Sequence, residues 1–327
     1  MAVISELVVV RSEPLCAESP ISLEDEVRTP VERFYVRNNF AVPAAVPALT
    51  IGGAVRRPFR LTPEELGRLP RRRLSTTLEC AGNGRSFMSP AVAGEEWRLG
   101  AVSTGAWEGI ALADLLDRAG VEAGAVEVLF HGADGFARSL PLERALHPDT
   151  LLADRLNGEA LRPEHGAPLR LLVPGWYGMA SVKWLSAVEV LTEPFEGHFQ
   201  RERYVIAGQP VREMRVRALI LDPPAGAGVR RARQTVRGLA WTGTGRVTAL
   251  ELSDDGGATW IAARLCGLPR DYTWRRWECE WEPSRSGPAT LLARAADSSG
   301  ERQPLEPVWN ALGYCYNTAV PHPLTVI

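Results

Sequence analysis

Cys80 ends an alternating apolar and polar run, and the sequence TTLECAGNGR then continues through a glycine-rich turn to a cation, Arg85. A thiolate is a soft ligand, so a thiol at such a junction can bind a metal. The glycines let the backbone pass close to a bound group, because they carry no side chain. An inert core thiol is the alternative. The spacing alone leaves both interpretations open.

The remaining cysteines form no pattern with Cys80. The five cysteines of the chain are Cys16, Cys80, Cys266, Cys279 and Cys315. Their number is odd and no two are spaced as C-x-x-C, which argues against a disulfide scaffold, a paired-cysteine zinc site and a C-x-x-C-H haem attachment. We therefore expect a reducing compartment, with at least one thiol free to act as a metal ligand.

The segment TWRRWECEWE predicts a strand that carries one charge on its apolar face. Alternation places Arg275 on the same face as Trp277, Cys279 and Trp281, with charged side chains on the other face. An inward arginine requires an anionic partner. That partner is either a local carboxylate or an anion that the protein binds, and the pattern leaves both open.

Composition indicates an ordinary globular protein. At 327 residues the chain is long enough for two domains, and 45% of its residues are hydrophobic and 23% charged. The formal net charge of −2 gives no field that would attract nucleic acid or an anionic membrane, so we expect neither as a partner. No run approaches the roughly 20 apolar residues of a membrane span. The N-terminal segment has neither a twin-arginine start nor a small-residue cleavage site, so we expect a cytoplasmic protein.

The first part of the chain predicts a mixture of strands and helix. Residues 75–80 and 125–132 have strand patterns, residues 111–120 have a helical pattern that ends at Gly120, and residues 167–192 predict two strands around a Pro174-Gly175 turn. This mixture lacks the regular alternation of a doubly wound fold and favours an α+β class.

The second part predicts a β-sandwich. Residues 195–215 are charged and poorly periodic, as expected of a linker. Short alternating strands broken by turn residues follow, and their spacing is typical of an immunoglobulin-like sandwich. We therefore expect a first domain with an extended N-terminal segment over residues 1–205 and a sandwich over residues 206–327.

Four motifs together resemble the sulfite oxidase family of molybdopterin enzymes. TTLECAGNGR is similar to its metal-ligand motif, FYVRNNF to its N-terminal pterin-contacting segment, and EHGAPLRLLVPGWYGMASVKWL to the long signature that closes its cofactor domain. VRGLAWTGTGRVTALELSDDGGATW, with TWRRW and PVWNALGY, is similar to its C-terminal dimerisation domain. The resemblance implies a mixed α/β molybdopterin-binding domain of the sulfite oxidase fold, followed by an immunoglobulin-like sandwich that forms a homodimer.

The same resemblance implies the cofactor and its ligands. Cys80 would be the single protein thiolate on the molybdenum of one molybdopterin. Positions that match pterin-binding residues are Tyr35, Val36, Arg37, Asn38, Asn39, Asp134, His165, Arg170, Ser181, Val182 and Lys183. Arginine and lysine suit the phosphate, and Asp134 suits the donors of the pterin ring. The family often has histidine where Asn39 and Ser181 stand, so neither position can carry charge here.

The resemblance also implies a substrate pocket. The matching positions are Arg37, Arg85, Trp97, Tyr204 and Arg275. They imply oxidation of sulfite to sulfate by oxygen-atom transfer. Because the chain has no haem motif, the electrons would pass singly to an external acceptor such as a cytochrome c or oxygen. The alternatives are a nitrate reductase-like or sulfane dehydrogenase-like enzyme that acts on another oxyanion or sulfur compound, and a cofactor-binding protein without turnover.

Overall fold

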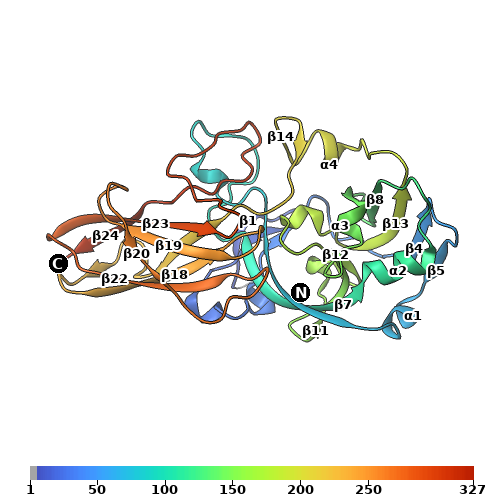
Figure 1. Cartoon of the computed structure of the whole chain (residues 1–327), viewed down its shortest axis with the longest axis horizontal. Coiled ribbons are helices and arrows are strands. Elements are labelled where there is room, and N and C mark those ends of the chain that lie inside the picture. The colour runs from blue at the N-terminus through green and yellow to red at the C-terminus, as the bar shows by residue number, and fades with distance from the viewer. Residues whose placement is uncertain (1–5) are drawn as a thin grey trace.

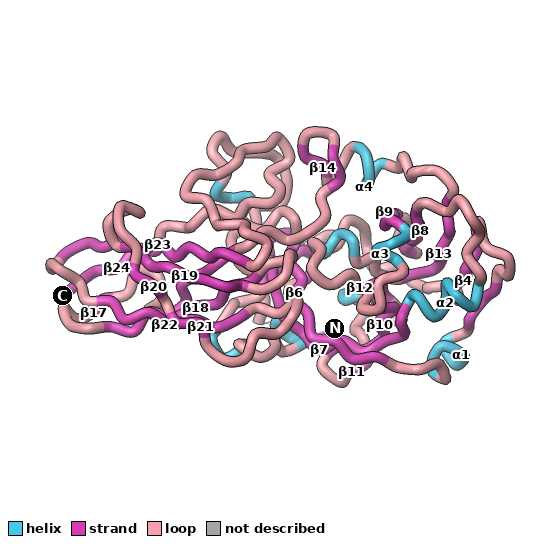
Figure 2. Tube along the Cα trace, viewed as in Figure 1, coloured by secondary structure: helices cyan, strands magenta, loops and turns pink. Residues whose placement is uncertain are grey.

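The computed structural model describes residues 6–327 as two bodies arranged along the long axis of the molecule (Figure 1). Strands dominate both bodies, and the helices are short (Figure 2). None of the helices within residues 6–327 has the length and apolar character required to cross a membrane. The predicted α+β class is confirmed for the first body, and the second body consists of strands.

The N-terminal segment forms a small sheet that carries Arg37. Its strands, in the order β1-β2-β3, are β1 (Val8–Arg11), β2 (Cys16–Glu18) and β3 (Val36–Arg37). Cys16 pairs with Arg37 in the register of β2 and β3. The predicted extended segment is therefore part of the ordered first body.

A second sheet carries Cys80 at the end of a strand. Its strands pair in the order β11-β10-β7-β6, and β12 also pairs with β10. These strands are β6 (Arg72–Glu79), β7 (Val102–Ala111), β10 (Leu151–Leu156), β11 (Glu159–Ala160) and β12 (Arg170–Leu172). The first two residues of β6 are exposed and its last four are buried, because the strand runs inward from the surface. Its end therefore delivers the following residue, Cys80, into the interior.

A third sheet has the order β5-β4-β13-β8-β9. Its strands are β4 (Leu49–Gly53), β5 (Phe59–Leu61), β8 (Glu127–Gly132), β9 (Ala137–Pro141) and β13 (Leu185–Leu191). The two strands predicted around the Pro174-Gly175 turn exist as β12 and β13, but they lie in different sheets. The chain between them crosses from one sheet to the other, and this crossing segment lines the pocket described below.

Among the described residues, four short α-helices complete the first body: α1 (Pro63–Gly67), α2 (Leu112–Ala119), α3 (Leu142–Ala145) and α4 (His198–Arg201). The helix predicted over residues 111–120 is confirmed as α2. Leu112, Leu115, Leu116 and Ala119 are its buried face, and Gly120 ends it with a φ of 69°. The predicted linker contains α4 and the small hairpin of β14 (Val205–Ile206) and β15 (Gln209–Pro210), so the predicted boundary at 205–206 falls inside β14.

The second body is a β-sandwich. One sheet has the order β16-β18-β22-β21, with β16 (Arg217–Asp222), β18 (Gln234–Trp241), β22 (Arg275–Trp281) and β21 (Arg264–Leu265). The other has the order β17-β24-β23-β19-β20, with β17 (Gly228–Val229), β24 (His322–Val326), β23 (Gly287–Asp297), β19 (Val247–Ser253) and β20 (Ile261–Ala262). Trp277, Cys279 and Trp281 are buried in its core, as the alternation of β22 predicts.

The two bodies share a hydrophobic core. Leu219, Leu239, Trp241 and Trp274 of the second body belong to the same buried cluster as the core of the first body. Other residues of the same strands, such as Ala218 and Ala240, pack inside the sandwich. The sheet formed by β16 and β18 therefore has one face in each core, and it connects the sandwich directly to the end of β6.

Candidate active site

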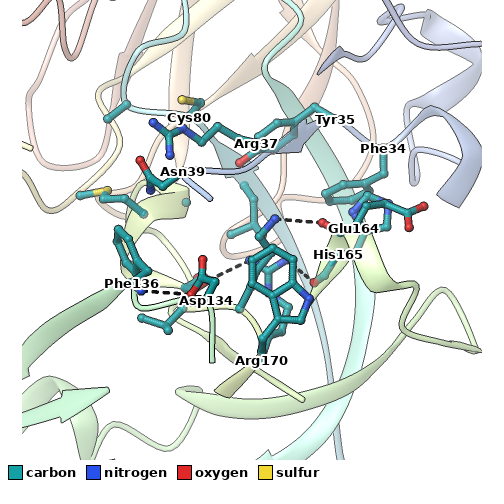
Figure 3. Close-up of a pocket in the computed structure, with 18 of the residues that line it drawn as sticks. Phe34, Tyr35, Arg37, Asn39, Cys80, Asp134, Phe136, Glu164, His165 and Arg170 are labelled. Carbon is teal, nitrogen blue, oxygen red and sulfur yellow. Dashed lines mark hydrogen bonds between the residues drawn. The ribbon is translucent and has the colours of Figure 1, made fainter. Parts of the chain in front are cut away.

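Most of the predicted site residues line one pocket in the first body (Figure 3). Predicted residues that line it are Tyr35, Arg37, Asn39, Cys80, Asp134, His165, Arg170, Ser181, Val182, Lys183 and Tyr204. They come from segments far apart in the sequence, and the three sheets of the first body bring them together.

Cys80 lies at one end of this pocket, directly after β6. Its N–H donates to the carbonyl oxygen of Ala101 at 2.8 Å, and its sulfur accepts the N–H of Gly82 at 3.4 Å. Burial raises the pKa of the Cys80 thiol to about 11, although the nearby cations Arg37 and Arg85 oppose that shift. The thiol is therefore protonated at neutral pH, and a bound metal would be the group that removes its proton.

Arg37 lies beside Cys80 and presents unpaired donors (Figure 3). Its Nε and Nη1 are buried and have no hydrogen-bond partner within residues 6–327. Nη2 lies 3.9 Å from Glu95 Oε2, and the guanidinium carbon lies 5.7 Å from the centroid of the Tyr204 ring. Unpaired buried donors on a cation are costly, so this arrangement suits a bound anion.

Three basic side chains lie toward the other end of the pocket, and they are not equivalent. Lys183 Nζ donates to the Glu164 carbonyl oxygen at 2.9 Å and to Asn38 Oδ1, and it lies 4.4 Å from the centroid of the Trp184 ring. Arg170 donates to the carbonyl oxygens of His165 and Ser181, each at 3.0 Å, so it mainly fixes the wall of the pocket. Burial, with the neighbouring cations Lys183 and Arg170, lowers the pKa of His165 to about 3, so this imidazole is neutral.

The polar groups between the two ends are held by short-range contacts. Asp134 Oδ1 accepts the Phe136 N–H at 3.1 Å, and burial raises the pKa of this carboxyl group. Asn39 Nδ2 donates to the Tyr204 hydroxyl at 3.4 Å. The Ser181 hydroxyl accepts the Val173 N–H at 3.0 Å. Asn39 and Ser181 therefore take part in hydrogen bonds here without carrying charge.

Tyr204 enters the pocket from the segment between the two bodies. Its φ of 54° is in the left-handed region, which a tyrosine rarely adopts, and its ring stacks on Tyr314 with a centroid distance of 5.2 Å. Burial raises its pKa to about 12, against the effect of Arg37. The phenol therefore keeps its proton and can donate a hydrogen bond.

Four predicted residues lie near the pocket without lining it. Val36 is buried behind the wall, and Asn38 reaches the site only through Lys183. Arg85 donates to the carbonyl oxygens of Leu312 at 3.2 Å and Glu95 at 3.0 Å. Trp97 is completely buried in the core cluster that also contains Cys80.

The structure does not bring Arg275 to the pocket, and this corrects its predicted place in the site. Its Nε donates to the Cys266 carbonyl oxygen at 3.1 Å and its Nη2 to the Gly267 carbonyl oxygen at 3.0 Å. Arg275 is the first residue of β22, where the alternation that buries Trp277 gives way to a loop. Its partners are therefore backbone carbonyl groups, which the sequence pattern did not indicate.

Several lining residues were not predicted, although most lie inside the motifs. They are Phe34, Leu78, Ala81, Phe136, Glu164, Gly178, Met179 and Trp184. A Cβ on Gly178 would lie 2.6 Å from the Tyr35 hydroxyl, so only glycine allows this approach. Glu95, two residues before Trp97, was also missed: its carboxylate forms an ion pair with Arg11 at 2.6 Å and lies 3.5 Å from Arg85.

These residues fit a molybdenum held by a molybdopterin. The pocket offers one buried thiol, an arginine with unpaired buried donors, a basic end for a phosphate, and a carboxyl group for ring donors. Cys80 would bind the metal, Lys183 the phosphate, and Asp134 the pterin. The donor set therefore agrees with the cofactor that the sequence motifs imply.

Comparisons with known proteins agree with this geometry. The model of the oxidoreductase molybdopterin binding domain matches residues 40–199, and that of the Mo-co oxidoreductase dimerisation domain matches residues 209–320. Chicken (Gallus gallus) sulfite oxidase is 36% identical over 92% of this chain and 74% of its own length. The chain belongs to the sulfite oxidase family. The family predicted from the motifs is thereby confirmed, as is molybdenum–molybdopterin as its cofactor.

Two further proteins extend the comparison. Mitochondrial sulfite oxidase of mouse (Mus musculus) is 34% identical over 93% of this chain, which spans 63% of the mouse protein's length. The sulfane dehydrogenase SoxCD of Paracoccus pantotrophus superposes with a TM-score of 0.78 at 28% identity, over 90% of this chain and 80% of the SoxCD chain. The fold of the family, with a molybdopterin-binding body and a β-sandwich, is therefore confirmed.

Proposed function

We propose that the protein oxidises sulfite to sulfate by oxygen-atom transfer. The observation that carries the proposal is the position of Arg37, whose unpaired buried donors lie in the same pocket as Cys80. When bound, molybdenum–molybdopterin supplies the oxygen-atom transfer and accepts the two electrons. The similarity to sulfite oxidases supports sulfite as the anion.

The residues of the chain bind and orient the substrate in this proposal. Arg37 neutralises the anion and donates a hydrogen bond to one of its oxygen atoms from its unpaired Nε or Nη1, in a pocket where water competes weakly. Tyr204 donates a hydrogen bond from its hydroxyl group to the substrate or product, because its raised pKa keeps the phenol protonated. Glu95 lies 3.9 Å from Arg37 and 3.5 Å from Arg85 and holds both cations in place before the anion binds. Arg85 and Trp97 support the site from behind its wall.

The partners and location belong to the same proposal. Electrons leave singly to an external acceptor such as a cytochrome c or oxygen. The C-terminal sandwich mediates a homodimer, which the matching dimerisation domain supports. We further propose that the sandwich has the immunoglobulin-like topology and that the enzyme acts in the cytoplasm.

Anaerobic titration with sulfite tests the activity without any acceptor. Oxidised protein is titrated while the thiolate-to-molybdenum absorption band is recorded, and we expect the band to bleach with one sulfite per molybdenum. The Cys80→Ser variant is the matched control, because it removes the thiolate and with it the band. A band that sulfite leaves unchanged would refute sulfite as the substrate.

A sulfane dehydrogenase-like activity is the second candidate, and the superposition with SoxCD favours it. The same titration with a thiol-bound sulfane in place of sulfite separates the two. Bleaching by the sulfane alone would assign the enzyme to that reaction.

A further inference from the structure

Glu79, the residue before Cys80, is a buried carboxylate with three donors that the proposed reaction does not use. Oε1 accepts Asn83 Nδ2 at 2.9 Å and Arg217 Nη1 at 2.8 Å, and Oε2 accepts the indole N–H of Trp241 at 2.8 Å. The Glu79 and Arg217 side chains are each only 1% exposed. The pair is therefore an ion pair removed from water.

The donors come from two bodies of the molecule. Asn83 belongs to the turn after Cys80, whereas Arg217 begins β16 and Trp241 ends β18, and these two residues pair in the register of the sandwich sheet. Arg217 Nη1 also donates to the Asn83 carbonyl oxygen at 3.2 Å. One guanidinium thus binds the residue before Cys80 and a residue three positions after it.

Hydrogen bonds of Asn83 also fix the turn between these contacts. The Asn83 N–H donates to the Cys80 carbonyl oxygen at 2.9 Å, and Asn83 Oδ1 accepts the Ala101 N–H at 3.2 Å. Gly84 continues the turn with a φ of 88°, and a Cβ there would lie 2.8 Å from Arg217 Nη2. Arg217 therefore packs against the turn as well as binding it.

A contribution to the folding stability of the protein does not explain why this ion pair is buried. Replacing a buried ion pair with well-packed apolar residues is often neutral or stabilising, because both charges lose their hydration. Arg217 even leaves its Nε and Nη2 buried without hydrogen-bond partners in the described part of the chain. What the network does provide is fixed geometry, since three rigid donors from two bodies hold one carboxylate.

We propose that Glu79, Arg217 and Trp241 are positioning residues, through which the sandwich sheet sets the place and accessibility of the Cys80 thiol. The inference rests on the proposed function only in taking Cys80 as the metal ligand. It assigns the second body a role in the site that is distinct from forming a dimer.

The test compares single and paired substitutions in the full chain. Arg217→Gln leaves Glu79 buried without its cation, and Glu79→Gln leaves Arg217 without its anion. The double variant Glu79→Gln/Arg217→Gln restores a neutral amide pair. Arg294→Gln is the matched control, because Arg294 binds Glu251 at 2.8 Å within the sandwich, in β23 and β19.

Two measurements report on position independently of turnover. The first is the rate at which a thiol reagent modifies Cys80 in cofactor-free full chain, assigned to this cysteine by peptide mass spectrometry. The second is the molybdenum and pterin content of the purified protein. We expect each single variant to raise the Cys80 modification rate at least tenfold and to lower the molybdenum content at least twofold. We expect the double variant to return to within threefold of the wild-type rate, and Arg294→Gln to match the wild type.

Single variants that lose thermal stability while Cys80 keeps its wild-type modification rate would overturn the proposal, because the pair would then be structural only. If the single charge variants do not fold, Trp241→Phe removes one hydrogen bond and no charge, and we expect a two- to fivefold faster modification; an unchanged rate there would also overturn it. Neither measurement uses sulfite. A protein that holds its cofactor without oxidising sulfite would refute the proposed function and leave this inference standing.

Discussion

Replacing Arg37 with methionine should stabilise the cofactor-free protein and weaken its binding of oxyanions. Arg37 keeps two buried donor atoms, Nε and Nη1, without partners among the described residues, and an unsatisfied buried donor costs about 1–3 kcal/mol. The side chain is 15% exposed and its nearest carboxylate contact, Glu95, is at 3.9 Å, so both the penalty and the ion pair are partial. Glu95 retains Arg11 at 2.6 Å in the variant. We therefore expect a net stabilisation of about 1–3 kcal/mol.

The effect on anion binding should have the opposite sign. A charge-assisted hydrogen bond contributes about 1.5–3 kcal/mol, so the loss of one or two corresponds to a reduction in affinity of at least about tenfold. Methionine is close to the arginine stem in length and fills the same space without a donor. Stability and affinity should thus change in opposite directions at this one position.

Two assays measure these quantities on the same samples. Urea denaturation of cofactor-free protein gives the free energy of unfolding, and calorimetric titration of the loaded enzyme with sulfate gives the anion affinity. Arg294→Met is the control, because that guanidinium binds Glu251 away from the pocket. An Arg37→Met variant that is less stable than the wild type and binds sulfate equally well would refute the assignment of Arg37 as an anion site.

Three further predictions concern individual residues of the site. Cys80→Ser should keep the pterin, measured by its fluorescence after release, while sulfite turnover is abolished; full turnover would refute the ligand assignment. Arg275→Met should leave the Michaelis constant for sulfite unchanged, because this side chain donates to the carbonyl oxygens of Cys266 and Gly267, and a tenfold increase would show that it reaches the substrate. For His165, whose pKa is about 3 in the folded protein and about 6.5 when unfolded, the unfolded state binds more protons below pH 6.5. Stability of the cofactor-free protein should therefore fall as the pH drops from 6.5, by up to about 1.4 kcal/mol per pH unit, and His165→Gln should flatten that slope in urea denaturation measured at several pH values.

Local patterns were sufficient for the elements and for most of the pocket. The helix over residues 111–120 follows from an apolar stripe and a terminal glycine, and both features are local. Cys80, Arg37 and Lys183 lie in motifs whose order along the chain is distinctive, so their convergence was foreseeable. Motif order carries this information because each motif includes the backbone features that the site requires, such as Gly178 against Tyr35.

Long-range pairing was beyond what the sequence pattern could supply. The strands on either side of Pro174-Gly175 read as neighbours, yet β12 pairs with β10 and β13 pairs with β4 and β8. Alternation fixes which face of a strand is buried and leaves the identity of its neighbours undetermined. Arg275 was misplaced for a related reason: the pattern gives the face of β22 but not the loop that meets its first residue.

The core shared by the two bodies has a consequence for the order of events during synthesis. Leu219, Leu239 and Trp241 complete the packing of the first body, although they are translated after every segment that lines the pocket. A nascent chain that has emerged only as far as Tyr204 therefore lacks part of its own interior, including the indole that binds Glu79. We therefore expect the pocket to become rigid only after the strands of the sandwich have been synthesised. Molybdopterin would then bind after translation.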